Sequence, residues 1–200
     1  LGEAHYSMVC NEQGGIKDDI FIYHTEPQEY LLCVNASNRA KIWSWLMEQT
    51  RGLSDLLLSD QSGDLAQLAL QGPTARAILS LAGVAGLETM KPRQCLHAPL
   101  AEASALITRT GYTGEPGYEL YIPRDRAAAV WDQMFEKGRA LGLKPCGLGA
   151  RDLLRLEMAY LLYGSEIGED TTPLEASASW VVDFQKRDFV GKATMSGQKA

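Results

Sequence analysis

A long amphipathic helix pattern that directly follows two strand patterns does most to limit how this chain folds. Over residues 124–141 apolar side chains gather on one helical face, and strand patterns precede them at 103–110 and 118–123. A second helix pattern at 148–162 is apolar on much of its circumference, so we expect that helix to be buried. Since strands and helices mix without a regular βαβ repeat, the sequence predicts an α+β fold of antiparallel sheets with packed helices.

The N-terminal part predicts a strand hairpin followed by a helix. Alternation at residues 4–10 and 16–23, on either side of a turn with two glycines, indicates two paired strands. A third strand is expected at residues 30–34. The polar residues 35–38 offer helix caps, and apolar side chains at helical spacing then predict a helix at 39–49.

A Gly-Pro step at Gly72 punctuates the chain at the point where a new strand and helix unit begins. A short apolar strand is expected just before it, at residues 65–70, and a helix just after it, from Thr74 to about Leu81. A chain of 200 residues allows two small domains. We therefore expect a domain boundary near Gly72, with domains of residues 1–72 and 73–200.

The charge balance excludes some classes of partner. The chain has a formal net charge of −6, from 25 acidic and 19 basic side chains. This balance argues against nucleic-acid binding, which needs a basic face. No apolar run reaches the roughly 20 residues that a membrane helix needs, so we expect no membrane partner.

The cysteines and histidines show no spacing typical of metal ligands. No two of the four cysteines stand as CxxC, all four lie in or near apolar runs, and the three histidines are far apart. We therefore expect no metal site and no disulfide framework, but buried free thiols in a reducing compartment.

The adjacent acids Asp18 and Asp19 are the first candidate for chemistry. They open a strand that is otherwise apolar, and their side chains point to opposite faces because strand residues alternate. One of them is therefore expected to face the core or a cleft together with Phe21 and Tyr23. The pattern alone favours the other reading, a polar strand start with an Asp that caps the turn.

The loop 111–117, with its three glycines, and the strand after it form the second candidate. Such a loop lets backbone approach a flat ligand closely, and Tyr112 lies within it. Glu119 follows in the strand, where a carboxylate accepts two parallel N–H bonds from a heterocycle such as a pterin ring. A glycine-rich hairpin with an exposed glutamate is the alternative.

Arg151 and Arg155 are the third candidate, because four residues apart on a helix they share one face. The planar guanidinium fork matches carboxylates, which belong either to a ligand or to the protein. Internal salt bridges on the helix face therefore remain an equal reading.

Taken together, these segments resemble the T-protein family, the folate-dependent aminomethyltransferases of the glycine cleavage system. The resemblance covers essentially the whole chain and is specific in the order and spacing of its blocks. The matching blocks are Tyr6-Ser7 with residues 11–19, and residues 34–36, 70–75, 111–119, 149–157, 163–164, 171–175 and Trp180.

The resemblance implies a three-domain folate-binding fold shaped like a cloverleaf. Residues 1–72 would then belong to its second domain and residues 73–200 to the later part of its first, ferredoxin-like domain. The family's N-terminal segment and its C-terminal barrel would be absent. The start at Leu1 also reads as that of a piece excised from a longer chain, so we expect the isolated piece to be inactive.

The resemblance also implies the activity. An aminomethyl group arrives on the lipoyl arm of the H protein, ammonia is released, and the carbon passes to the co-substrate tetrahydrofolate as 5,10-methylenetetrahydrofolate. The compartment would be the cytoplasm of a bacterium or the mitochondrial matrix of a eukaryote.

Functional residues carry over by position. Asp19 matches the acid near the folate reaction centre, Glu119 the pterin-binding acid, and Arg151 a folate-site arginine. The resemblance places three further residues in the pocket lining: Tyr6, Tyr112 and Cys33. Cys33 falls where the family usually has valine, a small apolar exchange. By the same alignment, Asp18 is expected to matter little for turnover.

Two rival functions share this fold. Folate-dependent demethylases act on dimethylsulfoniopropionate, sarcosine or dimethylglycine, and they share the folate residues. A non-catalytic folate-binding relative assists iron–sulfur cluster assembly and carries a motif that contains a cysteine. The matching region here, residues 186–192, has no cysteine, which argues against that relative.

Overall fold

The computed structural model describes residues 1–198, which divide into two compact units. Each unit is assembled from separate stretches of the chain. Unit 1 contains residues 1–4, 24–29 and 60–160, and unit 2 contains residues 5–23, 30–59 and those from Leu161 on.

Unit 1 is built on a four-stranded sheet with the order β4-β7-β6-β5. All of its strand pairs are antiparallel, as expected for the α+β class. The register pairs Glu119 on β7 with Ala69 on β4 and Thr108 on β6. The strands span Leu65–Gln71 (β4), Cys95–Leu100 (β5), Ala103–Thr108 (β6) and Gly117–Pro123 (β7).

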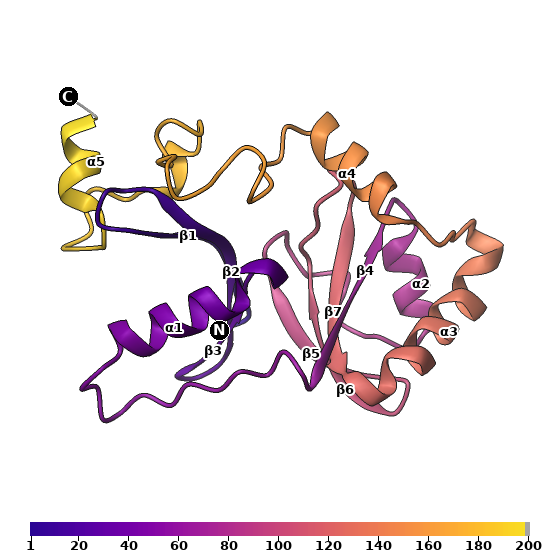
Figure 1. Ribbon diagram of the computed structural model, residues 1–200. Coiled ribbons are helices and arrows are strands. Elements are labelled where there is room, and N and C mark those ends of the chain that lie inside the picture. Colours follow the sequence, from indigo (N-terminus) through magenta and orange to yellow (C-terminus); the bar gives the residue numbers. More distant parts are fainter. Residues whose placement is uncertain (199–200) are drawn as a thin grey trace. The chain divides into compact units, whose positions relative to one another are not determined.

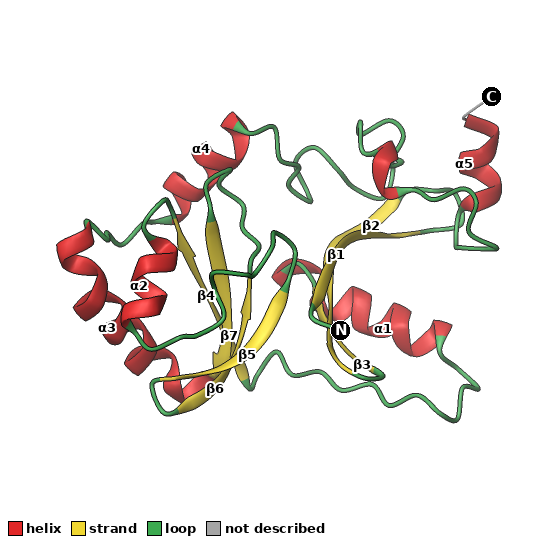
Figure 2. Ribbon diagram, turned by 180° about the vertical axis from the view of Figure 1, so that it is seen from behind, coloured by secondary structure: helices red, strands yellow, loops and turns green. Residues whose placement is uncertain are grey.

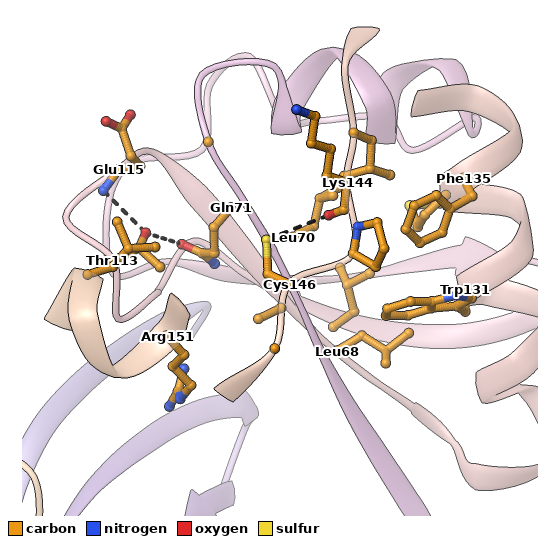
Figure 3. A pocket seen from close by; sticks show the side chains of 18 of the residues that line it. Leu68, Leu70, Gln71, Thr113, Glu115, Trp131, Phe135, Lys144, Cys146 and Arg151 are labelled. Atoms are coloured by element: carbon orange, nitrogen blue, oxygen red, sulfur yellow. Dashed lines mark hydrogen bonds between the residues drawn. The ribbon is translucent and has the colours of Figure 1, made fainter. Parts of the chain in front are cut away.

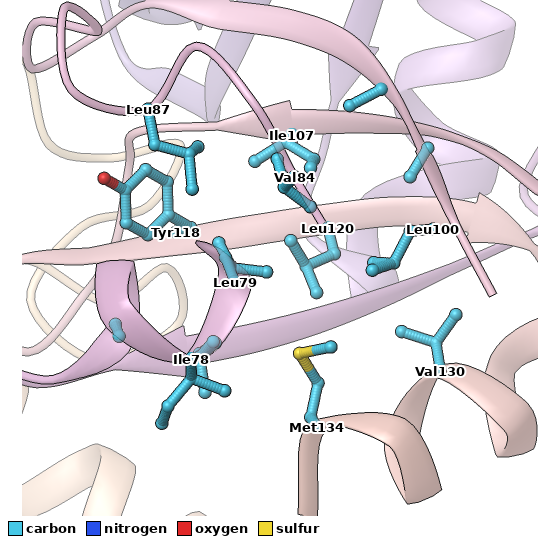
Figure 4. Packing of buried hydrophobic residues seen from close by; sticks show 14 of the residues in the cluster. Ile78, Leu79, Val84, Leu87, Leu100, Ile107, Tyr118, Leu120, Val130 and Met134 are labelled. Carbon is cyan, nitrogen blue, oxygen red and sulfur yellow. The ribbon is translucent and has the colours of Figure 1, made fainter. Parts of the chain in front are cut away.

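Helices α2 (Ala75–Leu81) and α3 (Ala127–Gly138) cover one face of this sheet (Figures 1 and 2). Between them and the sheet lies the main core, in which Leu120 of β7 and Val130 of α3 are fully buried (Figure 4). Burying such a side chain stabilises the fold by about 1.5–3 kcal/mol. Because Leu120 faces the helices, strand alternation places its neighbour Glu119 on the opposite face of the sheet.

Unit 2 contains the expected helix and most of the expected hairpin, whose strand ends at residues 3–4, 24–26 and 29 belong to unit 1. Strands β1 (Glu3–Cys10), β2 (Ile16–Glu26) and β3 (Glu29–Cys33) form a sheet in the order β1-β2-β3, and α1 spans Arg39–Gln49. Ile42 of α1 packs in a core with apolar residues of β1 and β2. The hairpin and helix predictions are confirmed, although β2 extends three residues further than expected.

Among the strands and α-helices of residues 1–198, two were not predicted from the sequence. One is β5, which contains Pro99 and lies at the edge of its sheet, where proline is tolerated. The other is the short C-terminal helix α5 (Lys192–Gln198), in unit 2. Among the helices of residues 1–198, none has both the length and the apolar character needed to cross a membrane.

The expectation for residues 148–162 is wrong in both length and burial. Helix α4 spans Leu148–Glu157, and Leu148 and Leu153 have 83% and 61% of their surface exposed. Arg155 is the buried residue of this helix. An apolar stripe predicts a helix, but it does not reveal whether another element covers that stripe.

The compact units also differ from the division expected at Gly72. Strand β4 ends just before Gly72 and pairs along its length with β7, so one sheet contains residues from both sides of the expected boundary. The residues from Leu161 on group with the N-terminal hairpin and α1, not with the sheet of unit 1.

Candidate active site

Asp18 lies in a buried network in unit 2. Its side chain is fully buried and accepts hydrogen bonds from the backbone N–H of Asn35 at 3.1 Å and from the Asn35 side-chain amide at 2.8 Å. The Asn38 amide donates a third bond. Asn35 and Asn38 occupy N-cap positions as expected, before the 3-10 helix Ala36–Asn38 and before α1, but neither side chain makes a capping hydrogen bond, because both amides bind this carboxylate instead.

Asp19 is the more accessible acid of the pair. The Tyr6 hydroxyl donates to Oδ2 at 3.0 Å, and the Asn35 amide donates to Oδ1 at 2.8 Å. Burial raises the pKa of the Asp19 carboxyl above its ordinary value, and the negative charge of Asp18 acts in the same direction. The two hydrogen bonds counter the rise because they stabilise the charged form.

Aromatic rings surround the Asp19 side of the strand. Tyr6 stacks on Trp180, with ring centroids 5.5 Å apart, and meets Phe21 edge to face at the same distance. Phe21 stacks in turn on the fully buried Tyr23. The sequence predicts one acid on a face with Phe21 and Tyr23, and by alternation that acid is Asp19.

Cys33 is partly buried at the end of β3, two residues before Asn35. Residues 1–198 include all four cysteines, whose thiols are not joined in disulfides, and Cys146 is exposed. Burial raises the pKa of the Cys10 thiol to about 11, which keeps it protonated.

In unit 1, Glu119 lies on the sheet face opposite the core and is 8% exposed. Gln67 donates its side-chain amide to Oε1 at 2.9 Å, and the Thr110 hydroxyl donates to Oε2 at 2.5 Å. Thr108 joins the network at 2.6 Å from the Thr110 hydroxyl. Gln67 and the two threonines were not predicted as site residues. Strand alternation, which places polar side chains on the same face as an acid, is the signal that could have identified them.

The glycine-rich loop has a local structural use. Gly111 and Gly117 flank the side chain of Gln71, and a Cβ at these positions would lie 2.0 and 2.3 Å from its Oε1. The Gln71 amide donates to the carbonyls of Thr110 and Tyr118, at 3.2 and 3.0 Å. These two glycines therefore make room for a protein side chain, where the sequence argument had expected a ligand.

Arg151 and Arg155 have different surroundings. The Arg151 guanidinium lies over the Tyr112 ring at 4.6 Å, and Tyr160 stacks on the same tyrosine at 5.7 Å. Arg155 is 4% exposed and pairs with Asp152 at 2.7 Å, so the salt-bridge reading holds for this arginine. Arg151 remains exposed and is the one of the two that is accessible to a ligand.

A cavity of about 270 Å³ opens in unit 1 between β4, α3 and the segment 143–147 (Figure 3). Of the six predicted site residues, Arg151 lines it. Its walls are mostly apolar, with Trp131 and Phe135 from α3 on one side. Further lining residues include Leu68, Leu70, Gln71, Thr113, Leu143, Lys144, Leu148 and Leu154.

The structure thus places the six predicted residues in two groups. Tyr6, Asp19 and Cys33 lie in unit 2, where Tyr6 contacts Asp19 directly. The other three, Tyr112, Glu119 and Arg151, lie in unit 1, where Tyr112 contacts Arg151.

Comparison with solved structures identifies the class of fold. The crystal structure of the glycine cleavage system aminomethyltransferase T from Bartonella henselae matches with a TM-score of 0.88 at 33% identity, over 100% of this chain and 54% of that chain. The chain thus has the fold of a glycine cleavage T protein. A heterotetrameric sarcosine oxidase from Corynebacterium sp. U-96 is similar in fold alone, with a TM-score of 0.53 at 16% identity over 74% of this chain and 69% of that chain.

The sequence comparisons identify the family. Residues 1–186 match the model described as GCVT N-terminal domain, and the chain belongs to this family. The aminomethyltransferase of Halothermothrix orenii is 43% identical over 194 residues, which are 97% of this chain and 54% of that relative. The chain therefore spans about half the length of the curated relatives it matches.

Proposed function

We propose that this chain carries the folate-binding part of an aminomethyltransferase of the glycine cleavage system. The observation that supports this most is the partly buried Asp19 carboxylate, held between Tyr6 and Asn35. The chain's membership of the GCVT N-terminal domain family also supports the proposal. The reaction releases ammonia from aminomethyl-lipoyl H protein and forms 5,10-methylenetetrahydrofolate.

Asp19 is suited to act at the reaction centre. Tetrahydrofolate, the co-substrate, supplies the nitrogens that take up the one-carbon unit. During that transfer positive charge develops on nitrogen and a proton must leave, and a carboxylate within hydrogen-bond reach stabilises the charge or accepts the proton. The raised pKa of Asp19 brings its proton affinity closer to neutral pH, where general bases are most effective.

Glu119 is suited to bind the pterin ring. Each of its carboxylate oxygens accepts one hydrogen bond within the protein, which leaves acceptor capacity on both for the paired N–H donors of a pterin. Because Gln67 and Thr110 already hold the carboxylate, little side-chain entropy is lost when a ligand binds.

Arg151 and Tyr112 are proposed to bind the remainder of the folate molecule. The exposed guanidinium of Arg151 is fixed by its contact with the Tyr112 ring, and it is free of the salt bridge that occupies Arg155. An arginine held in this way is suited to a ligand carboxylate. Tyr6 and Cys33 are proposed to line the folate pocket.

The proposed partner is the lipoylated H protein, and the proposed compartment is the bacterial cytoplasm or the mitochondrial matrix. Both proposals rest on the resemblance to the T-protein family and on relatives named aminomethyltransferase.

A comparison of one-carbon donors tests this function. The complete protein is incubated with tetrahydrofolate and one donor at a time: aminomethyl-loaded H protein, dimethylsulfoniopropionate, sarcosine or dimethylglycine. Of these four donors, we expect only the aminomethyl-loaded H protein to transfer its carbon, with release of ammonia. Turnover of a demethylase substrate without turnover of the H protein would overturn the proposal, and folate binding without turnover of any donor would favour the non-catalytic relative.

A further inference from the structure

We propose that Asn35 is a positioning residue for the reaction-centre acid, and that the buried Asp18 carboxylate holds Asn35 in place for this task. This inference rests on the proposed function of Asp19. It gives a role to Asp18, the one acid of the pair that the mechanism leaves unused.

The geometry of one amide group carries the inference. The Asn35 side-chain nitrogen lies 2.8 Å from Oδ1 of Asp18 and 2.8 Å from Oδ1 of Asp19, and it also lies 3.2 Å from the Asp19 backbone carbonyl. Two adjacent strand residues point to opposite faces, so their carboxylates do not normally share a partner. Asn35 joins them because it follows β3, the strand beside β2.

Asp18 fixes Asn35 at two points. Its Oδ2 accepts the backbone N–H of Asn35 at 3.1 Å, while its Oδ1 accepts the side-chain amide of the same residue. The Asn38 amide adds a further donor to Oδ1. A fully buried charge requires such donors, and hydrogen bonds to a charged group are stronger than neutral ones, so this network is rigid.

The two oxygens of Asp19 are thereby restrained from different directions. Asn35 donates to Oδ1, and Tyr6, whose ring is stacked on Trp180, donates to Oδ2. With one donor on each oxygen, the plane of the carboxylate is set. Rate depends strongly on such positioning, because displacing a catalytic group by about 1 Å costs up to 10²-fold.

A positioning role predicts a change in the titration of Asp19. The titratable groups that act on this carboxyl are Tyr6 from β1 and Asp18 on its own strand. The Asn35 bond stabilises the charged form, so its loss raises the pKa of Asp19 further. A hydrogen bond to a charged group corresponds to about one pKa unit, so the acid limb of turnover moves up by about one pH unit.

The test compares Asn35→Ala with Asn11→Ala in the complete protein. Asn11 is the matched control, since its side chain accepts two backbone N–H bonds and donates to the carbonyl of Glu169, all within unit 2, and none of these bonds involves Asp19. The pKa of Asp19 is followed by the carboxyl carbon signal in protein labelled at aspartate, assigned with Asp19→Asn. Turnover with aminomethyl-loaded H protein is measured across pH, and thermal unfolding is recorded for each variant.

We expect Asn35→Ala to raise the pKa of Asp19, shift the acid limb of turnover upward and lower kcat by about 10- to 100-fold. Asn11→Ala should lower thermal stability but leave both the pKa of Asp19 and the acid limb of turnover unchanged. An Asp19 pKa that is unchanged in Asn35→Ala, or one that moves as much in Asn11→Ala, overturns the proposal. If Asn35→Ala does not fold, Asn35→Ser removes the same amide with a smaller loss of polarity and is judged by the same outcomes.

The carbon signal separates this inference from the proposed function. A raised Asp19 pKa in Asn35→Ala, in a protein that does not turn over loaded H protein, supports the contact with Asn35 and overturns the function. Normal turnover of loaded H protein by the unaltered protein, with an unchanged Asp19 pKa in Asn35→Ala, supports the proposed function and overturns the positioning role of Asn35.

Discussion

At the scale of single residues, two adjacent acids differ because of what surrounds them. Asp18 is fully buried among three N–H donors, whereas Asp19 is partly buried and holds one donor on each oxygen. The resemblance predicts that Asp18 matters little for turnover. The proposed positioning role of Asn35 gives the opposite expectation, because Asp18→Asn would set an amide against the donors of Asn35 and Asn38.

Replacing Asp19 tests the reaction-centre assignment. Asp19→Asn keeps the shape of the side chain and removes its charge, so we expect turnover to fall by about 10²-fold or more. Folate affinity, measured by calorimetric titration, should change much less. Asp170→Asn alters an exposed acid of the same unit and is the control, for which turnover should be unchanged.

The pH dependence of the unaltered protein belongs to the same test. Asp19 must be ionised to accept a proton, so turnover should fall as the pH drops through its pKa. Since burial raises that pKa, the fall should occur above the pH range of an ordinary aspartate. Full turnover of Asp19→Asn, or a fall confined to the ordinary aspartate range, would contradict the assignment.

Glu119→Gln tests the pterin-binding assignment in the complete protein. An amide offers one acceptor oxygen where the carboxylate offers two, so one charge-assisted bond to the ligand is lost. We expect folate affinity to weaken by about 1.5–3 kcal/mol. Glu88→Gln, which changes an exposed glutamate of the same unit outside the cavity lining, is the matched control. Equal affinities for the two variants in calorimetric titration would remove Glu119 from the site.

At the scale of elements, the turn that joins β1 to β2 is fixed by a close approach at Gly15. A Cβ built at this position would lie 1.7 Å from the carbonyl oxygen of Glu169. The same segment accepts the backbone N–H of Ile16 through the carbonyls of Gly168 and Thr171, at 3.1 and 3.0 Å. The hairpin that carries Asp19 therefore depends on this contact.

Gly15→Ala should displace the segment and lower the free energy of unfolding by about 1–3 kcal/mol, the usual cost of overpacking. Gly168→Ala is the control from the same segment, where an added Cβ meets nothing within 4 Å. The measurement is denaturant unfolding of both variants. Equal stability of the two variants would show that the close approach does not exist in solution.

Most elements could be predicted from the sequence because their patterns are local. Alternation marked β1, β2 and β7, and helical spacing marked α1 and α3. The failures have physical causes. The edge strand β5 contains Pro99, a residue that argues against a strand in the sequence. Helix α4 has an apolar stripe, but the sequence does not show whether another element covers that stripe.

The acids of the candidate site could be predicted from the sequence, but their hydrogen-bond partners could not. Asp19 and Glu119 were found as carboxylates in otherwise apolar strands and through the resemblance to a family. Asn35 was expected to cap a helix, and Gln67 was not noticed, because hydrogen bonds between distant segments leave no periodic signal. Their roles follow from the sheet registers and from the turn after β3.

At the scale of the whole molecule, the chain spans about half the length of its curated relatives. We expect the isolated chain of 200 residues to release no ammonia from aminomethyl-loaded H protein, because catalysis depends on how all walls of a site position the substrate. Leu148 and Leu153 of α4 are exposed, and exposed apolar patches often mark an interaction surface. Measurable ammonia release by the isolated chain would contradict this expectation.

The most direct test of the central claim follows the transferred carbon itself. The complete protein is mixed with H protein that carries an isotopically labelled aminomethyl group and with tetrahydrofolate, and ammonia and folate products are measured together. We expect one labelled carbon in 5,10-methylenetetrahydrofolate for each ammonia released, with both formed about 10²-fold more slowly by Asp19→Asn. Ammonia without labelled folate, or equal label with Asp19→Asn, would contradict it.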